Sequence, residues 1–341
     1  MRAVFRYTTL ASVALAAACA TVPVTGDPAV TIFARGETAP VGTATGIDAA
    51  DDPAIWRNPE NPAGSLIVGT DKKAGLYLYD MNGKGVDFDP GGKLNNVDLV
   101  SSDLHGVIVA ASDRNDPLHA RMRVYRLNIA ARKLELIGEA DVGQGEAYGF
   151  CMAVRGDDIL TYSALKDGTV REFRLDVSQG TAVSTRLRTM KLASQIEGCV
   201  VDPRDGTLYV GEEDVGIWRF AAGSTEGTMF APVDNKMLVA DVEGLAIMPE
   251  GENGGYLVAS SQGDSAYAVY QLANGKPVGR FRIAASKFGA VEETDGIDLV
   301  GGSFGPGYPQ GLFVAQDGQN DPASQNFKLV SWADILTAIG R

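Results

Sequence analysis

Short runs of apolar residues alternate with polar turns along most of the chain, and no long stretch has the 3.6-residue period of an amphipathic helix. The runs are rich in β-branched and aromatic residues and are separated by Gly, Asp, Asn and Pro, which predicts an all-β fold. The exception is the tail from Trp332 to Ile339, where we expect a short closing helix.

The runs form a repeat. Each unit opens with an acid or a Tyr followed by a small apolar strand, and the openings are 46 to 52 residues apart, at Asp52, Asp98, Tyr148, Glu197, Glu243 and Asp295. A second and a third strand follow in every unit, as in Leu66-Ile67-Val68-Gly69-Thr70 and Leu76-Tyr77-Leu78-Tyr79. Units of this size with three or four strands predict a six-bladed β-propeller over residues 45–341. A pair of β-sandwiches is the alternative.

The first residues have the pattern of an export signal. Arg2 and Arg6 precede an uncharged stretch that is too short to span a membrane as a helix. It ends in Leu15-Ala16-Ala17-Ala18-Cys19, which resembles a bacterial lipobox. We expect residues 1–19 to be a signal peptide with a lipid anchor at Cys19, and residues 20–44 to be a linker. Plain cleavage near Ala18 or Ala20 is the alternative. Either way we expect an exported protein: an outer-membrane lipoprotein, or a periplasmic or secreted one.

The composition limits the kinds of molecule that we expect the protein to bind. The net charge is −13, and removal of the leader would take away two Arg but no acid, which disfavours nucleic acid and anionic membrane surfaces as partners. A closed propeller gives no reason to expect more than a monomer. Cys151 and Cys199 could pair in an oxidising compartment, but we favour two buried free thiols.

Antiparallel pairing places the start of each first strand beside the end of the second strand. Two positions per blade should therefore ring one mouth of the central channel. The first set is the six openings named above. The second set is Lys72, Arg114, Lys166, Glu212 with Glu213, Gln262 and Asp317.

The acids in these sets are candidate metal ligands. The first set alone holds five carboxylates, at Asp52, Asp98, Glu197, Glu243 and Asp295. Carboxylates this close repel one another unless their pKa values rise or cations bind. Oxygen ligands without His or Cys favour a hard cation, and flexible loops favour Ca²⁺ over Mg²⁺. The alternative for any single acid is a turn cap or an ordinary ion pair.

The candidate cationic side chains lie on one half of the predicted ring of mouth positions. The second strands of blades one to three end at Lys72, Arg114 and Lys166, whereas those of blades four to six end in acids or Gln. A basic half suits phosphate, and Arg can donate two hydrogen bonds to it. Together the two halves predict a metal-assisted phosphate hydrolase. No Gly-x-Ser-x-Gly elbow, His cluster or P-loop supports a rival chemistry.

At these residues the chain resembles the β-propeller phytases, the calcium-dependent alkaline 3-phytases. The matching segments run in consistent order from about residue 45 to the C-terminus: Asp48-Ala49-Ala50-Asp51-Asp52-Pro53-Ala54-Ile55-Trp56, Lys93-Leu94-Asn95-Asn96-Val97-Asp98, Tyr148-Gly149-Phe150, Ser194-Gln195-Ile196-Glu197-Gly198, Glu212-Glu213-Asp214, Asp241-Val242-Glu243-Gly244-Leu245, Thr294-Asp295-Gly296-Ile297-Asp298 and Asn326-Phe327-Lys328.

The resemblance implies a six-bladed propeller with several calcium ions, and attack of a calcium-bound water on the phosphate monoesters of phytate (myo-inositol hexakisphosphate). By similarity, the calcium ligands around the cleft match Asp52, Glu197, Asp241, Glu243 and Asp295. Glu212 and Tyr148 match residues that contact the metal cluster or phosphate. The phosphate-binding cations match Lys72, Arg114 and Lys166.

The chain departs from the family pattern at several positions. An Asp that the family uses as a calcium ligand is missing between Ala284 and Glu293, and Asp113, Asp167 and Val100 replace the usual Asn, Glu and Arg. Two further functions stay open: a non-enzymatic, calcium-stabilised propeller that binds a partner at the cell envelope, and a calcium-dependent lactonase. Neither needs three phosphate-binding cations.

Overall fold

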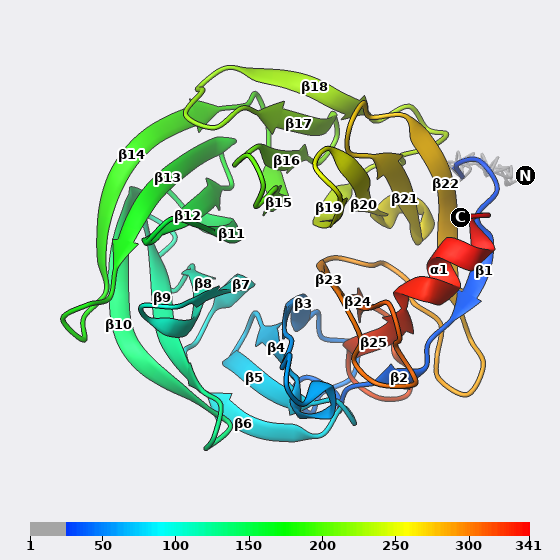
Figure 1. Cartoon of the computed structure of the whole chain (residues 1–341), viewed down its shortest axis with the longest axis horizontal. Helices are drawn as coiled ribbons and strands as arrows, with labels where there is room; N and C mark the ends of the chain where they lie inside the picture. Colours follow the sequence, from blue (N-terminus) through cyan, green and yellow to red (C-terminus); the bar gives the residue numbers. More distant parts are fainter. Residues whose placement is uncertain (1–24) are drawn as a thin grey trace, which may run out of the picture.

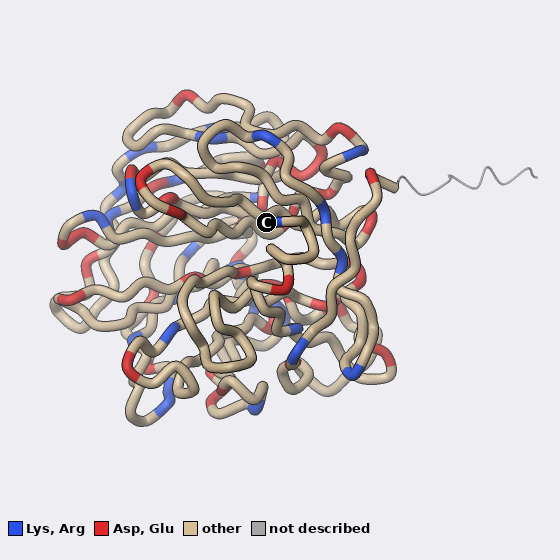
Figure 2. The backbone as a smooth tube through the Cα atoms, turned by 45° about the vertical axis from the view of Figure 1, so that its right-hand side comes forward, with Lys and Arg blue, Asp and Glu red and all other residues tan. Residues whose placement is uncertain are grey.

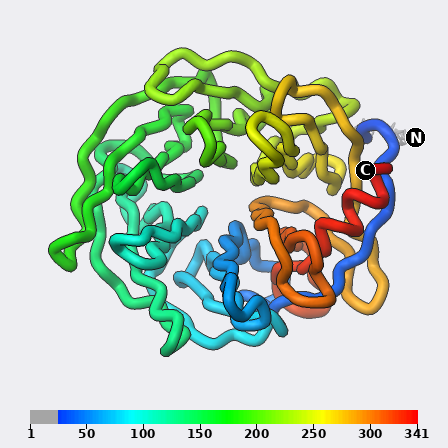
Figure 3. Tube along the Cα trace, in the orientation of Figure 1, coloured from blue at the N-terminus to red at the C-terminus, as the bar shows by residue number. Residues whose placement is uncertain are grey.

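The structure, a computed structural model, describes residues 25–341, which form six sheets arranged as blades around a central axis (Figures 1 and 3). Five blades have four strands and one has five. The first strand of each repeat lies closest to the axis (Figure 1). The outermost strand is the last of the repeat in four blades and comes from the N-terminal segment in the other two. The prediction of an all-β, six-bladed propeller is confirmed.

The strands follow the predicted repeat. Blade 1 consists of β3 (Ala50–Trp56), β4 (Leu66–Asp71), β5 (Gly75–Asp80) and β6 (Gly85–Asp89). Blade 2 consists of β7 (Leu94–Ser102), β8 (Gly106–Asp113), β9 (His119–Asn128) and β10 (Lys133–Gln144). Blade 3 consists of β11 (Ala147–Arg155), β12 (Asp158–Leu165), β13 (Thr169–Asp176) and β14 (Val183–Lys191). Blade 4 consists of β15 (Ile196–Val201), β16 (Leu208–Glu212), β17 (Gly216–Phe220) and β18 (Gly227–Pro232).

The last two blades also use strands from the N-terminal part of the chain. Blade 5 consists of β19 (Val242–Glu250), β20 (Gly254–Ser261), β21 (Ala266–Gln271), β22 (Pro277–Ala284) and β1 (Val30–Phe33). Blade 6 consists of β23 (Ile297–Gly301), β24 (Gly311–Asp317), β25 (Asn326–Ser331) and β2 (Gly36–Glu37). The helical elements are η1 (Pro62–Gly64), η2 (Gln262–Asp264) and α1 (Trp332–Ala338). Helix α1 confirms the predicted closing helix.

The hydrophobic core is divided among the six blade interfaces. Each interface holds its own cluster of buried side chains from two adjacent blades. Between blades 5 and 6, for example, Val258 and Tyr267 pack with Phe313, and all three are fully buried. Each interface therefore fixes the position of one inner strand relative to the next.

The N-terminal segment closes the ring, and this corrects the predicted linker over residues 20–44. Strand β2 pairs antiparallel with β25, and β1 pairs parallel with β22. Lys328 of β25 has a fully buried side chain, and its Nζ lies 2.7 Å from Glu37 Oε2 and 3.1 Å from Asp317 Oδ2. One buried ammonium thus joins the N-terminal strand to blade 6.

The cysteine prediction is wrong, because Cys151 and Cys199 form a disulfide. The two residues are 48 positions apart, which is one blade repeat, so they fall on the adjacent inner strands β11 and β15. Their Cα atoms are 5.7 Å apart, which suits a disulfide. The match between the cysteine spacing and the repeat length is the signal that the sequence offered.

The predicted signal peptide and Cys19 lie outside the described residues. Within residues 25–341, no helix is both long and apolar enough to cross a membrane. The side of the molecule seen in Figure 2 carries Lys and Arg interspersed with Asp and Glu.

We predict that Lys328→Met lowers the free energy of unfolding by about 3–5 kcal/mol, because it leaves Asp317 and Glu37 without their buried cation. The matched control is Lys133→Met at an exposed position, which should change it by less than about 0.5 kcal/mol. Denaturant unfolding checks both values. Equal effects of the two variants would show that the buried ammonium does not hold the ring closed.

Candidate metal and phosphate site

A pocket of about 640 Å³ lies where the inner strands of several blades begin. We call it the mouth pocket. It is lined by Asp48, Asp51, Lys72, Tyr148, Gln195, Glu197, Glu213, Asp241, Glu243, Gln262, Gly263, Ser265, Glu293, Asp295, Gly318 and Gln325. Of the predicted site residues, it therefore brings together Lys72, Tyr148, Glu197, Glu213, Asp241, Glu243 and Asp295.

A β-bulge at the start of the inner strands positions these side chains. In blades 1 to 5 the pairing with the second strand is interrupted by one extra residue, as between Ile196 and Cys199 in blade 4. In blades 1, 3, 4 and 5 the first residue of the bulge lines the pocket, as Glu197 does. The second is Gly in blades 3 to 5, because a Cβ at Gly149 would lie 1.8 Å from the Glu197 carbonyl oxygen of the next blade.

Because of the bulge, the first-strand positions predicted in blades 1 and 2 are held by other residues than expected. In blade 1 it is Asp51 that lines the pocket, while Asp52 accepts a hydrogen bond from the Val97 amide at 3.0 Å. In blade 2 the equivalent residue is Asn95, and Asp98 lies three residues further along the strand, where it accepts a hydrogen bond from the Met152 amide at 2.7 Å. Neither Asp52 nor Asp98 lines the mouth pocket.

Two of the predicted second-strand residues, Glu212 and Asp317, do not line the pocket. Glu212 is buried inside blade 4, where it accepts hydrogen bonds from Ser194 and from the Trp218 indole at 2.8 Å. Asp317 is buried beside Lys328 in blade 6. The residues that follow them line the pocket: Glu213, which was predicted together with Glu212, and Gly318.

The residues that sequence reasoning missed include Asp51 and Asn95. A signal for both existed. In blades 4 to 6 the pocket residue lies two positions before the apolar residue at which regular pairing resumes, as Glu197 does before Cys199. Regular pairing resumes at Pro53 in blade 1 and at Val97 in blade 2, and the residues two positions earlier are Asp51 and Asn95. Asp52 and Asn96 stand where the other blades have Gly, and this hides the correspondence.

Three carboxylates form a cluster that fits a metal ion. Oxygen atoms of Glu197, Glu213 and Glu243 all lie within 4.8 Å of one another. The buried Oε2 of Glu243 has no hydrogen-bond partner among residues 25–341. Within the same described part of the chain, no His or Cys lines the pocket. An unpartnered buried oxygen among other carboxylates is the donor set that a hard cation such as Ca²⁺ requires.

Burial makes this cluster unfavourable when it is fully charged. Burial raises the pKa of Glu197 well above its usual range, and Glu243 and Asp51 add to the shift. Burial likewise raises the pKa of Glu243, with a further contribution from Asp295. The pKa of Asp295 is raised to about 7 by burial and then by Asp51, although Lys72 opposes the shift. Either protons or cations must compensate these charges.

Lys72 is the cation inside the pocket. Its Nζ lies 2.7 Å from Asp48, 2.9 Å from Asp51 and 3.3 Å from Asp295. Burial alone would lower the pKa of Lys72, but the three carboxylates outweigh burial and raise it. Lys72 therefore stays charged at every physiological pH.

The other two predicted cations, Arg114 and Lys166, do not line the pocket but flank Tyr148, which does. The Arg114 guanidinium lies 5.3 Å and Lys166 Nζ lies 5.1 Å from the centre of the Tyr148 ring, at cation–π distances. Arg114 is held by a hydrogen bond of 2.6 Å to Asn95 and an ion pair of 2.8 Å with Glu146. The cations thus lie on blades 1 to 3, and the charged pocket residues of blades 4 to 6 are all acids; the start of blade 1 also contributes Asp48 and Asp51, which pair with Lys72.

Comparisons with known proteins agree with this arrangement. A family model described as Phytase matches residues 4–341. A protein named 3-phytase from Bacillus subtilis (strain 168) is 39% identical over 330 residues, which cover 91% of this chain and 85% of that relative. A chain in a solved structure titled Crystal Structure of Mitotic Checkpoint Complex aligns with a TM-score of 0.51 and 12% identity, covering 96% of this chain and 86% of that chain.

At 12% identity the likeness to that solved structure concerns the fold alone. The family match and the 39% identical relative each span nearly the whole chain, and the family match includes the segments that build the mouth pocket. The resemblance predicted from the motifs is thereby confirmed: this chain belongs to the phytase family.

Proposed function

We propose that this phytase hydrolyses phosphate monoesters of phytate at the mouth pocket, and that calcium ions held by the acidic cluster are required. The observation that carries the proposal is the unpartnered, buried Oε2 of Glu243 beside Glu197 and Glu213. A buried charge of this kind is costly unless a cation compensates it. The family match supports the substrate.

The chain's own residues have distinct proposed tasks. Glu197, Glu213 and Glu243 would hold calcium, with Asp51, Asp241 and Asp295 close by in the same pocket. Bound calcium would neutralise charge on the phosphate and make a nearby water more acidic. Lys72, Arg114 and Lys166 would bind phosphate oxygens, and the last two both contact the Tyr148 ring.

The proposal explains how an acidic protein binds an anionic substrate. The net charge of −13 would repel phytate, but cations bound in the acidic half would reverse the local sign where the substrate lies. The pocket volume of about 640 Å³ is in the usual range for small-molecule sites. Export, lipid attachment at Cys19 and a monomeric state stay proposals that rest on the sequence.

The direct test is phosphate release from phytate by the purified protein, with calcium and then with excess chelator. We expect release to stop in chelator and to return when calcium is restored, because the carboxylate cluster would then again be compensated. The control is the circular dichroism spectrum in chelator, which must show a folded protein. Undiminished release by metal-free, folded protein would contradict a calcium requirement.

Two adjacent glutamates give a matched pair of variants. We predict that Glu213→Gln weakens calcium binding by about tenfold or more, because Glu213 belongs to the cluster. Glu212→Gln should leave calcium affinity unchanged. It should instead lower the free energy of unfolding by about 1–3 kcal/mol, because the new amide NH₂ group would face a donor, Ser194 or Trp218.

Calorimetric titration with calcium and denaturant unfolding measure the two effects separately. The reverse outcome, with calcium affinity lost only in Glu212→Gln, would show that the family role predicted for Glu212 is right despite its place inside the blade.

Calcium affinity should also depend on pH. In the free protein the pKa of Asp295 is raised to about 7, first by burial and then by Asp51, so a proton competes with a cation near neutral pH. Affinity should therefore increase with pH from 6 to 8, by up to about tenfold per pH unit for each proton displaced. Calorimetry in two buffers of different ionisation enthalpy measures the proton release. An affinity that is constant over this range, with no proton released, would refute the assignment.

A further inference from the structure

The disulfide crosses the boundary between the basic and the acidic half of the mouth pocket. We infer that Cys151–Cys199 is a positioning element of the site, which sets the spacing between the phosphate-binding side on blade 3 and the metal-binding side on blade 4. The inference rests on the proposed function. It concerns what the disulfide does for binding, beyond holding the fold together.

The two cysteines follow, in sequence, the bulges that carry pocket residues. Cys151 lies three residues after Tyr148 on β11, and Cys199 lies two residues after Glu197 on β15. Regular pairing in blade 4 resumes at Cys199 itself. The bulges also touch, since a Cβ on Gly149 would lie 1.8 Å from the Glu197 carbonyl oxygen. A shift of one bulge would therefore move the other.

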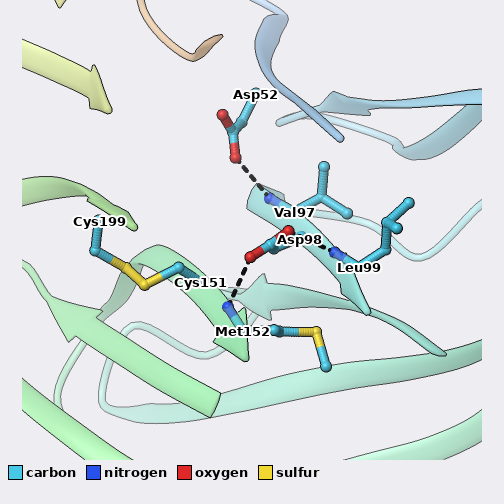
Figure 4. Close-up of a disulfide and its surroundings, with 7 residues drawn as sticks. All are labelled: Asp52, Val97, Asp98, Leu99, Cys151, Met152 and Cys199. Atoms are coloured by element: carbon cyan, nitrogen blue, oxygen red, sulfur yellow. Dashed lines mark hydrogen bonds between the residues drawn. A yellow bond between two sulfur atoms is a disulfide. The ribbon is translucent and has the colours of Figure 1, made fainter. Parts of the chain in front are cut away.

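Equivalent positions in other blades carry a different connection between blades. Cys151 directly follows the residue at which regular pairing resumes in blade 3. The residues in the same place are Asp98 in blade 2 and Asp298 in blade 6. Asp98 accepts a hydrogen bond from the Met152 amide of blade 3, and Asp298 accepts one from the Ile55 amide of blade 1, both at 2.7 Å. Figure 4 shows the Asp98 connection beside the disulfide.

The disulfide and the Asp298 connection lie at the two boundaries between the halves. Blades 1 to 3 supply Lys72, Arg114 and Lys166, and blades 4 to 6 supply the clustered acids. The halves meet between blades 3 and 4, where the disulfide lies, and between blades 6 and 1, where Asp298 lies. At the second boundary Lys72 also pairs with Asp295. At the first boundary, the covalent bond holds Cys199, two residues after Glu197, against blade 3.

The test compares the wild-type protein with the double variant C151A/C199V. This pair copies Ala54 and Val97, which occupy the same two positions between blades 1 and 2, so the fold already accommodates it. We expect the affinity of the calcium-loaded protein for inorganic phosphate to fall by about 10- to 100-fold, with a matching increase in the KM for phytate, because the two halves lose their fixed spacing. The melting temperature should also fall.

Arg204→Ala is the stability control. It removes the hydrogen bond of 2.8 Å from Arg204 to the Gly254 carbonyl, which joins blade 4 to blade 5 away from the mouth pocket. This variant should lower the melting temperature but leave phosphate affinity unchanged. A double cysteine variant that behaves in the same way would overturn the inference, because the disulfide would then be a structural cross-link only.

Reduction of the wild-type protein gives a second route if the variant does not fold. A small dithiol would reduce the disulfide to two thiols while being oxidised to its own cyclic disulfide, so two electrons are transferred. Phosphate affinity should fall on reduction and return on reoxidation; reduced protein with full affinity would overturn the inference. A wild-type protein that binds neither calcium nor inorganic phosphate would instead refute the proposed function.

Discussion

The close approach of neighbouring inner strands decides where the bulge residues of the mouth pocket point. The second bulge residue of one blade lies against the backbone of the next, as when the Gly244 amide donates to the Asp295 carbonyl at 3.1 Å. A Cβ at Gly198 would lie 2.0 Å from the Glu243 carbonyl oxygen. In blades 3 to 5 no side chain fits there, so the first bulge residue is the one that faces the pocket. Packing between blades thus concentrates functional groups at one end of the axis.

This concentration has an electrostatic cost that shapes the chemistry. The converging residues are mostly acids, and burial raises the pKa of Glu197 and of Glu243. Lys72 compensates Asp51 and Asp295 on one side of the pocket, whereas Glu243 keeps an unpartnered oxygen on the other. The same constraint therefore leaves one part of the ring internally neutralised and another part dependent on a cation from solution. Net charge alone would not have located either.

The repeat was enough to predict the propeller, because each blade carries its own apolar strands and turns at a regular spacing. The strands β1 and β2 could not be found in this way, since they are short and lie outside the repeat. The site was predicted in part. Glu197, Glu243 and Asp295 each precede a Gly, so their register is visible in the sequence. In blades 1 and 2 the second bulge residue is Asp52 or Asn96 in place of Gly, so the register cannot be recognised in this way. The places of Arg114 and Lys166 beside Tyr148, outside the pocket lining, depend on side-chain contacts that no local pattern encodes.

Asn95 shows why one position of the ring is neutral. Its amide nitrogen donates to Glu197 at 2.8 Å and to Asp51 at 3.1 Å, while its oxygen accepts from Arg114 at 2.6 Å. An aspartate there could accept from Arg114 but would repel both carboxylates, and a lysine could donate to the carboxylates but not accept from Arg114. Only an amide satisfies both sides at once. Arg114 and Glu197, which carry opposite charges, are therefore joined through a residue that carries no charge.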